Sequence, residues 1–299
     1  MSGVPVSVLR MPLLPLDAKD SPEDVVRLRM YLDLCEELER DHERLAGVRP
    51  RVGSRLDVDN ERSHPLQNGH LAAFCQLMAI DNLRAFRLLT RRTSDDNVEL
   101  PLFAGYPLLR SVIESASQTI WLLEPEDRKE RLTRNFRARM SEHQHDVELA
   151  KSVFTAKPAE TPADRLERVA AQEADKKAAQ RRVKMIDAAA GNNAITREQY
   201  NQPMPGYRSL AYQAGVFSGL DAGVVKTVWL WVSGLTHPSA ARALNSTDFL
   251  KRSSTRRGEM HGLMTSKTGM LVATLSVALT TYKDADRLLR TAMLTVDDR

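Results

Sequence analysis

Residues Pro101–Glu124 read PLFAGYPLLRSVIESASQTIWLLE, and this stretch decides the fold class. Apolar residues surround nearly all of the helix that it predicts, which is typical of a helix at the centre of a bundle. Glu124 precedes Pro125, which ends the helix because the residue before a proline disfavours the helical conformation. The apolar positions are Leu108, Leu109, Val112, Ile113, Ala116, Ile120, Trp121, Leu122 and Leu123.

A polar stripe interrupts this apolar helix. Arg110, Glu114 and Gln118 are four residues apart, so their side chains share one helix face. Charges inside an apolar helix need partners, since burying an unpaired charge is costly. We therefore interpret the stripe either as a polar pocket in the bundle core or as a structural ion pair between helices, and the sequence leaves both open.

The composition is that of an ordinary globular protein. Among 299 residues, 42% are hydrophobic but only 5% are aromatic, so the core must rely on Leu, Val, Ala and Met. The net charge of +4 permits an acidic partner such as nucleic acid without requiring one. Prolines interrupt the apolar N-terminus, which argues against a signal peptide, and the longest apolar run, 269–279, is too short to span a bilayer. We expect a cytoplasmic protein with no membrane contact.

The cysteines and the acidic and histidine residues give no convincing metal site. Cys35 and Cys75 lie on apolar faces of predicted helices, where they are expected to act as small buried hydrophobes in a reducing compartment. Glu39 and His42 form a Glu-x-x-His motif, but a di-iron bundle needs two such motifs and further carboxylates. The second half is offered only by residues 145–148, in reversed order. We predict neither metal nor cofactor.

Helix signals recur along the chain, without strand alternation of useful length. Ser21 and Pro22 start a helix that runs to about Leu45. Residues 47–65 are predicted to be irregular. The sequence therefore predicts an all-α multi-helix bundle, with residues 21–299 forming a single helical domain. Further helices are predicted over about 67–92, 101–124, 126–154, 161–190, 224–235 and 266–294.

Residues 126–190 predict a long antiparallel helical hairpin, and residues 1–20 predict an extended N-terminal arm. Alternating steps of four and three place an apolar seam on one side of the first hairpin helix. The second helix, which Thr161 caps, is rich in Ala and charge but poor in large apolar residues. Because the arm and the hairpin both require a partner surface, we expect a homo-oligomer. The seam contains Leu132, Phe136, Met140, His143, Val147, Ala150 and Phe154.

His237 is the strongest candidate for a histidine near the polar stripe. Pro238 follows it and ends the preceding helix, and a helix C-terminus favours a charged imidazole. Ser233 lies one turn earlier on the same face and is a second candidate. The alternative is a histidine that only satisfies the terminal carbonyls of its helix.

Two segments carry a resemblance to known proteins. Residues 229–239, WLWVSGLTHPS, resemble a segment of uncharacterised helical proteins of actinomycetes and their phages, in which an Arg-x-x-x-Glu helix is a common companion. Here Arg110 and Glu114 match that companion. The resemblance covers these two segments and a similar order of helices, and it implies no established activity. More distantly, the chain is similar to the HEPN ribonuclease superfamily, helical bundles whose Arg-x(4–6)-His motif cleaves RNA in toxin and phage-defence systems.

Two pairs in the first hairpin helix match the spacing of the HEPN motif, Arg137 with His143 and Arg139 with His145. Six residues on a continuous helix place side chains well apart around the axis, since each residue adds roughly 100°. His143 also falls on the apolar seam. Helices rich in arginine produce such matches easily, so we favour Arg110, Glu114 and His237 as the catalytic candidates.

A basic segment supplies the remaining candidate binding residues. Lys251, Arg252, Arg256 and Arg257 belong to a predicted flexible loop, where they would contact phosphates if nucleic acid were a partner. Solvated charge is the simpler interpretation, since no aromatic residues are interleaved for stacking on single strands. Together with Gln118 and Ser233, these four are the candidate binding residues.

Three hypotheses for function follow. The first is a HEPN-like nucleic-acid-acting protein of defence or toxin type, in which Arg110, Glu114 and His237 form the pocket. The second is a non-catalytic oligomeric interaction or assembly protein, in which the same residues form a structural network. The third and weakest is a metal-dependent oxidase. The sequence does not decide whether the protein is an enzyme.

Overall fold

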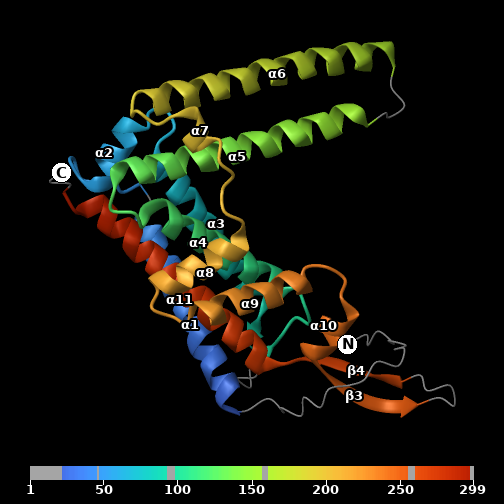
Figure 1. The fold of residues 1–299 in the computed structure, drawn as a ribbon. Coiled ribbons are helices and arrows are strands. Elements are labelled where there is room, and N and C mark those ends of the chain that lie inside the picture. Colours follow the sequence, from blue (N-terminus) through green and yellow to red (C-terminus); the bar gives the residue numbers. More distant parts are fainter. Residues whose placement is uncertain (1–21, 46, 93–97, 157–160, 255–259, 297–299) are drawn as a thin grey trace. The chain divides into compact units, whose positions relative to one another are not determined.

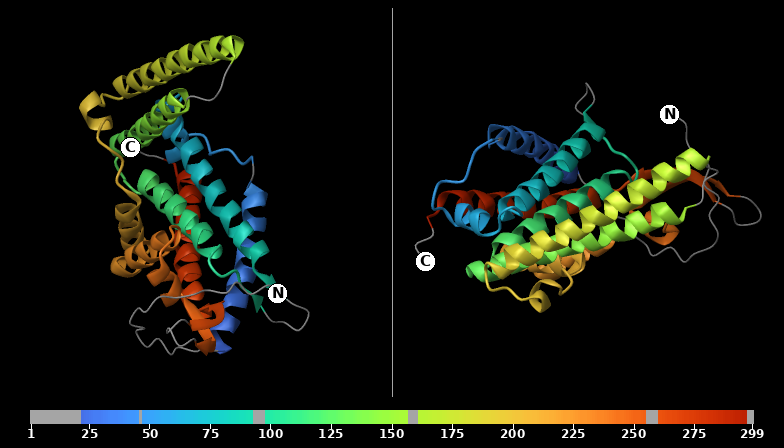
Figure 2. Two further views of the ribbon diagram at one scale, coloured as in Figure 1. Left: turned by 90° about the vertical axis from the view of Figure 1, so that its right-hand side faces the viewer. Right: turned by 90° about the horizontal axis from the view of Figure 1, so that it is seen from above.

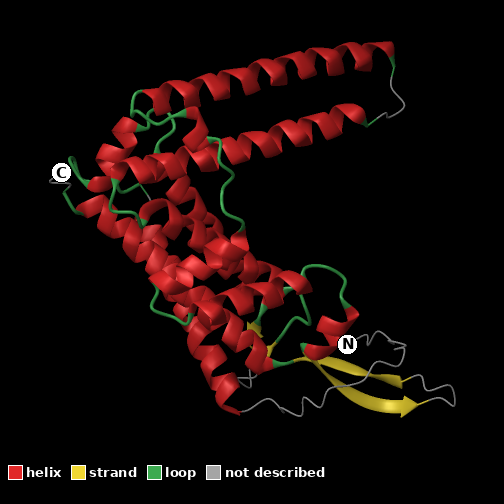
Figure 3. Cartoon of the chain, viewed as in Figure 1, coloured by secondary structure: helices red, strands yellow, loops and turns green. Residues whose placement is uncertain are grey.

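The computed structural model describes residues 22–45, 47–92, 98–156, 161–254 and 260–296 of the chain (Figure 1). The N-terminal arm expected over residues 1–20 lies outside the described residues. Helices dominate the described part of the chain, which confirms the predicted all-α multi-helix bundle (Figure 3). Its helices are α1 (Pro22–Leu45), α2 (Arg55–Arg62), α3 (Asn68–Leu89), α4 (Gly105–Leu123), α5 (Arg128–Thr155), α6 (Pro162–Gly191), α7 (Arg197–Tyr200), α8 (Tyr207–Phe217), α9 (Ala222–Leu235), α10 (Ala240–Asn245) and α11 (Thr268–Leu294).

Two short antiparallel pairs of strands accompany the helices. Strand β1 (Arg91–Arg92) pairs with β2 (Val98–Glu99), and β3 (Thr247–Ser254) pairs with β4 (Met260–Ser266). The register of the second pair runs from Thr247 opposite Ser266 to Ser254 opposite Met260. The prediction that Lys251 and Arg252 lie in a flexible loop is therefore wrong, because both belong to strand β3: Lys251 lies opposite Gly262, and the register shifts at Arg252.

The contacts divide the chain into two compact units. Unit 1 consists of the described residues within 1–48, 75–117 and 207–286. Unit 2 consists of those within 49–74, 118–206 and 287–299. The expectation that residues 21–299 form a single domain stays a prediction. Among the helices that the structure describes, none combines the length and the hydropathy that crossing a membrane requires.

Unit 1 is built around α1 and the parts of α3, α4 and α11 that belong to it, which run side by side (Figure 2). Their apolar faces are buried, and Tyr31 on α1 donates a hydrogen bond to Ser276 on α11 at 3.2 Å. Gly105 begins α4 at a close approach, because a Cβ there would lie 2.9 Å from the ring of Phe86. The core includes Leu28, Leu32, Cys35, Leu83, Phe86, Leu109, Val112, Ile113, Leu275 and Tyr282.

Unit 2 contains α5 and α6, which run side by side (Figures 1 and 2). Asp127 caps α5 by accepting a hydrogen bond from the backbone N–H of Glu130 at 2.9 Å. Thr161 and Asp164 form a capping box at the start of α6, where Pro162 takes the first helical position. Where the two helices lie close to α7, apolar side chains form a buried cluster of Leu132, Phe136, Met140, Ile186, Ala189, Ala190, Ile195 and Tyr200.

Candidate functional site

The predicted polar stripe meets α9 inside unit 1. Arg110 and Glu114 lie on α4 and form an ion pair, with Arg110 Nε 2.7 Å from Glu114 Oε1. The same Oε1 accepts a hydrogen bond from the indole Nε1 of Trp229 on α9 at 2.9 Å. Arg110 Nη1 donates to Thr236 Oγ1, also at 2.9 Å. Two helices more than a hundred residues apart in sequence are thus joined through one carboxylate and one guanidinium.

Local structure holds each partner on α9 in place. Asp221 caps the N-terminus of this helix by accepting from the backbone N–H of Gly223 at 2.7 Å. Thr236 is the C-cap, and its hydroxyl donates to the carbonyl of Ser233 at 2.7 Å. That bond leaves the lone pairs of Thr236 Oγ1 available to accept from Arg110. The N–H of Trp229 points at an acceptor, as is usual for a partly buried indole.

The electrostatic environment of the pair is intermediate between core and surface. The side chains of Arg110 and Glu114 are 26% and 18% exposed. The guanidinium carbon of Arg110 lies 5.7 Å from the centroid of the Trp229 ring, within range of a cation–π contact. Donors from α4 and α9 therefore converge on the carboxylate of Glu114, and these hydrogen bonds join the two helices.

His237 occupies a different position from the one expected of a catalytic group. It follows the C-cap Thr236 and is exposed, whereas Thr236 itself contacts Arg110. The corner at residues 236–239 therefore reaches the polar stripe, but through the threonine hydroxyl. The role of His237 stays a prediction.

The other candidate binding residues are dispersed. Gln118 lies one turn beyond Glu114 on α4 and is half-buried, in the part of the helix that belongs to unit 2. Ser233 is half-buried on α9 and contributes its backbone carbonyl to Thr236. Lys251 and Arg252 lie in β3, and Arg256 and Arg257 lie outside the described residues.

Sequence reasoning missed Trp229 and Thr236 as members of the network. Trp229 lies in the helix predicted over residues 224–235, and its indole N–H needs an acceptor when it is buried. Trp229, Ser233 and Thr236 recur at steps of four and three, which places them on one face of α9. That spacing is the signal in the sequence that could have indicated partners for Arg110 and Glu114 on this helix.

A fully buried ion pair lies in unit 2, and the sequence did not predict it. Arg131 on α5 binds Asp59 on α2 through both ends of its guanidinium, at 2.6 and 2.9 Å, and both side chains are 1% exposed. Arg131 also donates to the carbonyls of Pro125 and Glu126. This geometry is bidentate and fully satisfied, so it fits a structural role.

The residues considered for a metal site serve another purpose. Glu39 binds Arg87 with two hydrogen bonds of 2.7 Å, and these bonds raise the pKa of Arg87. Burial is the main cause that raises the pKa of the Cys35 thiol to about 12, which keeps it protonated and unreactive. Cys35 and Cys75 are buried thiols outside any disulfide, which agrees with their prediction as small buried hydrophobes. Among the described residues, no group of three or more His, Cys, Asp or Glu is arranged to hold a metal ion.

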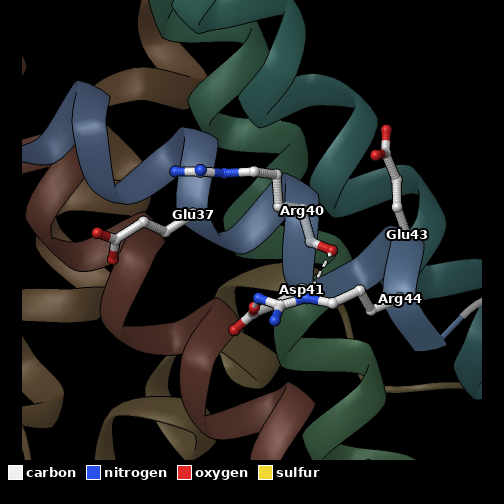
Figure 4. A pocket seen from close by; sticks show the side chains of 5 residues that line it. All are labelled: Glu37, Arg40, Asp41, Glu43 and Arg44. Carbon is white, nitrogen blue, oxygen red and sulfur yellow. Dashed lines mark hydrogen bonds and ion pairs between the residues drawn. The ribbon is translucent and has the colours of Figure 1, made fainter.

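A pocket of about 710 Å³ lies along the C-terminal half of α1. Figure 4 shows that its five lining residues all extend from this helix, with Glu37 and Glu43 pointing in different directions. Arg44 is paired with Asp41, three residues earlier. These side chains come from one helix, point in different directions and partly neutralise each other. We therefore interpret this pocket as a solvated charged face of α1.

The pairs with HEPN-like spacing on α5 do not assemble a site in the described contacts. Arg137 donates to the backbone carbonyls of Gln202 and Pro203, and Arg139 pairs with Glu142. His143 instead lines a groove between α5 and α6. Burial is the main cause that lowers its pKa, and the nearby charge of Arg182 lowers it further.

A groove with a largely apolar lining runs between α5 and α6 in unit 2. Its volume is about 670 Å³. It is the continuation of the seam that is closed at Leu132, Phe136 and Met140. Beyond Met140 the same side of α5 is only partly covered, so apolar side chains remain accessible. The lining residues that are apolar are Val147, Leu149, Ala150, Val153, Phe154, Ala178 and Ala179.

Two candidate features therefore exist: a satisfied polar network in unit 1 and an open apolar groove in unit 2. Comparisons with models of protein families, with curated proteins and with solved structures found no match to this chain.

Proposed function

We propose that the protein is a non-catalytic assembly protein that acts as a homo-oligomer. The observation that carries the proposal is that the apolar seam between α5 and α6 is buried over one part of its length and open over the other. A side of α5 that is fully buried at Phe136 opens into a groove of about 670 Å³ at Val147 and Phe154. Extended apolar grooves on helices are common docking surfaces for other helices.

The polar network of unit 1 supports a structural role for Arg110 and Glu114. The carboxylate oxygen that binds Arg110 is also bonded to Trp229, and Arg110 is bonded to Thr236. The network links α4 to α9 and uses the polar groups that a substrate would have to engage. In this proposal its purpose is to fix the packing of the two helices.

Substituting Glu114 tests that role. Glu114→Ala removes the acceptor for both Arg110 and Trp229, so we expect a loss of roughly 1–3 kcal/mol in unfolding free energy. His237→Ala is the matched control, because the exposed imidazole makes no comparable contact with Arg110, and its unfolding free energy should match that of the wild type. Thermal or urea unfolding measures both. Equal stability of Glu114→Ala and wild type would contradict a structural network.

Light scattering on the purified chain at micromolar concentration tests the proposed assembly. We expect a mass that is a multiple of the chain mass. A monomer across the micromolar range would overturn the proposal.

A HEPN-like nucleic-acid-acting function is the second candidate. One observation favours it: the bond between Arg110 and Thr236 brings α4 to the corner that carries His237. In this alternative, Arg110, Glu114 and the exposed His237 act on RNA. Wild-type protein would then degrade RNA, His237→Ala would lose the activity and His143→Ala would keep it. Intact RNA with wild-type protein excludes this candidate in favour of the assembly protein.

A further inference from the structure

The part of α3 that belongs to unit 1, residues 75–89, is apolar on two opposite sides. One side is buried in the core of the unit and includes Leu83 and Phe86. A surface helix ordinarily carries polar residues on the side away from the core. On α3 that side instead exposes large apolar side chains: Leu77 (51% exposed), Met78 (40%), Leu88 (61%) and Leu89 (42%). These residues give α3 an apolar surface beyond the one that it buries in its own core.

The exposed side chains of α3 form one continuous stripe. Leu77, Asp81, Arg84 and Leu88 recur at steps of four, three and four, which places them in a line along the helix. Met78 and Leu89 are separated by about three turns, so they lie together along one edge of that line. The outer stripe of α3 consists of Leu77, Met78, Asp81, Arg84, Leu88 and Leu89, all of which are exposed.

The two charged residues of the outer stripe have opposite signs and no partner within the chain. In the part of the chain that the structure describes, the side chains of Asp81 and Arg84 form neither an ion pair nor a hydrogen bond. Arg87, by contrast, is bound by Glu39 of α1 through two hydrogen bonds. The outer stripe therefore presents one acid and one base that a docking surface can neutralise.

The order of residues along the outer stripe is symmetric about the midpoint between Asp81 and Arg84. Leu77 lies four residues before Asp81, and Leu88 lies four residues after Arg84. An antiparallel copy of the helix that shares this midpoint would place Leu77 opposite Leu88 and Asp81 opposite Arg84, each pair occurring twice. A parallel copy would place Asp81 opposite Asp81 and Arg84 opposite Arg84, and such like-charge contacts are costly.

We infer that the outer stripe of α3 docks on the same stripe of a second copy of this chain, antiparallel, about a twofold axis that passes between Asp81 and Arg84. This inference rests on the proposed self-assembly, and it adds an interface in unit 1 to the groove of unit 2. A twofold interface uses the same patch on both copies, so the patch must be complementary to itself. The stripe meets this requirement in its charges and in its leucines, and steps of four and three suit helix packing.

A lysine in the outer stripe tests the apolar part of the interface. Leu88→Lys would bury a charge between the two copies, so its dissociation constant should be at least roughly tenfold higher than that of the wild type. Val216→Lys is the matched control, because Val216 lies on α8, outside the stripe, and is also 61% exposed. Sedimentation velocity over a concentration series measures both full-length variants, and circular dichroism checks their helical content.

Charge reversal tests the antiparallel direction. Asp81→Arg places arginine opposite Arg84 of the second copy, and Arg84→Asp places aspartate opposite Asp81. Each variant alone should therefore associate at least roughly tenfold more weakly than the wild type at low salt. In an equimolar mixture of the two variants, both contacts regain opposite signs, so association should recover. Repulsion within each altered helix persists in the mixture, so a defect of the helix alone would not be relieved.

The outcomes separate this inference from the proposed function. A monomeric wild-type chain overturns both. If the wild type is oligomeric but Leu88→Lys associates as well as it does, or if the mixture associates no better than either charge variant, something other than a second α3 covers the stripe; the inference is then overturned and the assembly function stands. A mass that is lowered by Leu88→Lys but not by Phe154→Ala supports the α3 interface and overturns the groove as an assembly surface.

Discussion

The α5–α6 hairpin has a closed part and an open part, although the same two helices form both. The closed part, the base, is the buried cluster that includes Leu132, Phe136, Met140, Ile186 and Ala190. The open part, the tip, is the groove lined by residues 143–154 of α5 and 172–182 of α6. In the base, Phe136 is fully buried and Arg131 is locked to Asp59. At the tip, Phe154 lines an open groove and Arg182 meets Asp146 on the surface. The heptad-like seam on α5 continues through both parts. A repeating apolar pattern therefore predicts that a helix face is buried, but it does not predict which part of the structure covers that face.

The difference lies in what α6 offers opposite each part. Near the base, α6 contributes Ile186 and two alanines, and residues 195–200 add Ile195 and Tyr200 to the same cluster. Opposite the tip, α6 contributes mainly alanine and charge. A stretch of α6 without large apolar residues does not close a seam that carries Phe and Val, so the groove is open among the described residues.

The largest expected loss of stability comes from a substitution in the apolar seam of α5. Phe136→Ala removes a buried ring from the base and should lower the unfolding free energy by about 3–5 kcal/mol. Phe154→Ala is the matched control at the tip. It should change the stability of the monomer little while weakening self-association. Urea unfolding at low and high protein concentration separates the two effects, and equal losses for both variants at low concentration would contradict the division into closed base and open tip.

The base and the tip also differ in their ion pairs, of which one is buried and the other is exposed. Asp59→Ala leaves the fully buried Arg131 without its carboxylate and should cost roughly 3–5 kcal/mol. Asp146→Ala breaks an exposed pair with Arg182 and should cost at most about 1 kcal/mol. Thermal unfolding compares them directly. Similar losses for the two variants would mean that burial does not set the strength of these pairs.

The sequence predicted the helices well because each carries its own signals. Pro22 and Pro162 at helix starts, and the periodic apolar residues between the caps, are local features that no distant partner alters. The short helix α2 and the β3–β4 strands were missed. Residues 55–62 form only two turns with few apolar positions, and the strand pair is stabilised by backbone bonds that leave no long pattern.

The candidate site was predicted in part for the same reason. The pair of Arg110 and Glu114 follows from a spacing of four residues on one helix. Its partners on α9 are more than a hundred residues away, and no local pattern specifies which hydroxyl or indole will meet the pair. The bond between Asp59 and Arg131 spans 72 residues and lies beyond sequence reasoning for the same reason.

A single substitution in the groove should affect self-association while changing the stability of the monomer only slightly. Leu149 lines the groove but is largely exposed in one copy of the chain. Leu149→Lys should change the unfolding free energy of the monomer by less than about 0.5 kcal/mol. It should also shift the association equilibrium toward monomer, because a charge would be buried between copies. Sedimentation velocity over a concentration series measures the shift, and an unchanged equilibrium would place Leu149 outside the interface.

The smallest expected effect is a dependence on pH. The pKa of His143 is lowered in the folded chain, mainly by burial and then by Arg182, with Asp146 opposing. The folded state therefore binds fewer protons than the unfolded state as the pH falls through the ordinary histidine range, so stability should decrease there and level off below the folded pKa. His143→Gln should flatten this part of the profile. A profile that is identical in both proteins would contradict the assignment.

Light scattering of the full chain tests the proposed assembly most directly. We predict a mass that is a multiple of the chain mass for the wild type at micromolar concentration, and a lower mass for Phe154→Ala, whose ring lines the groove. A wild-type monomer across the micromolar range, or a Phe154→Ala variant that associates as well as the wild type, would contradict the proposed assembly surface.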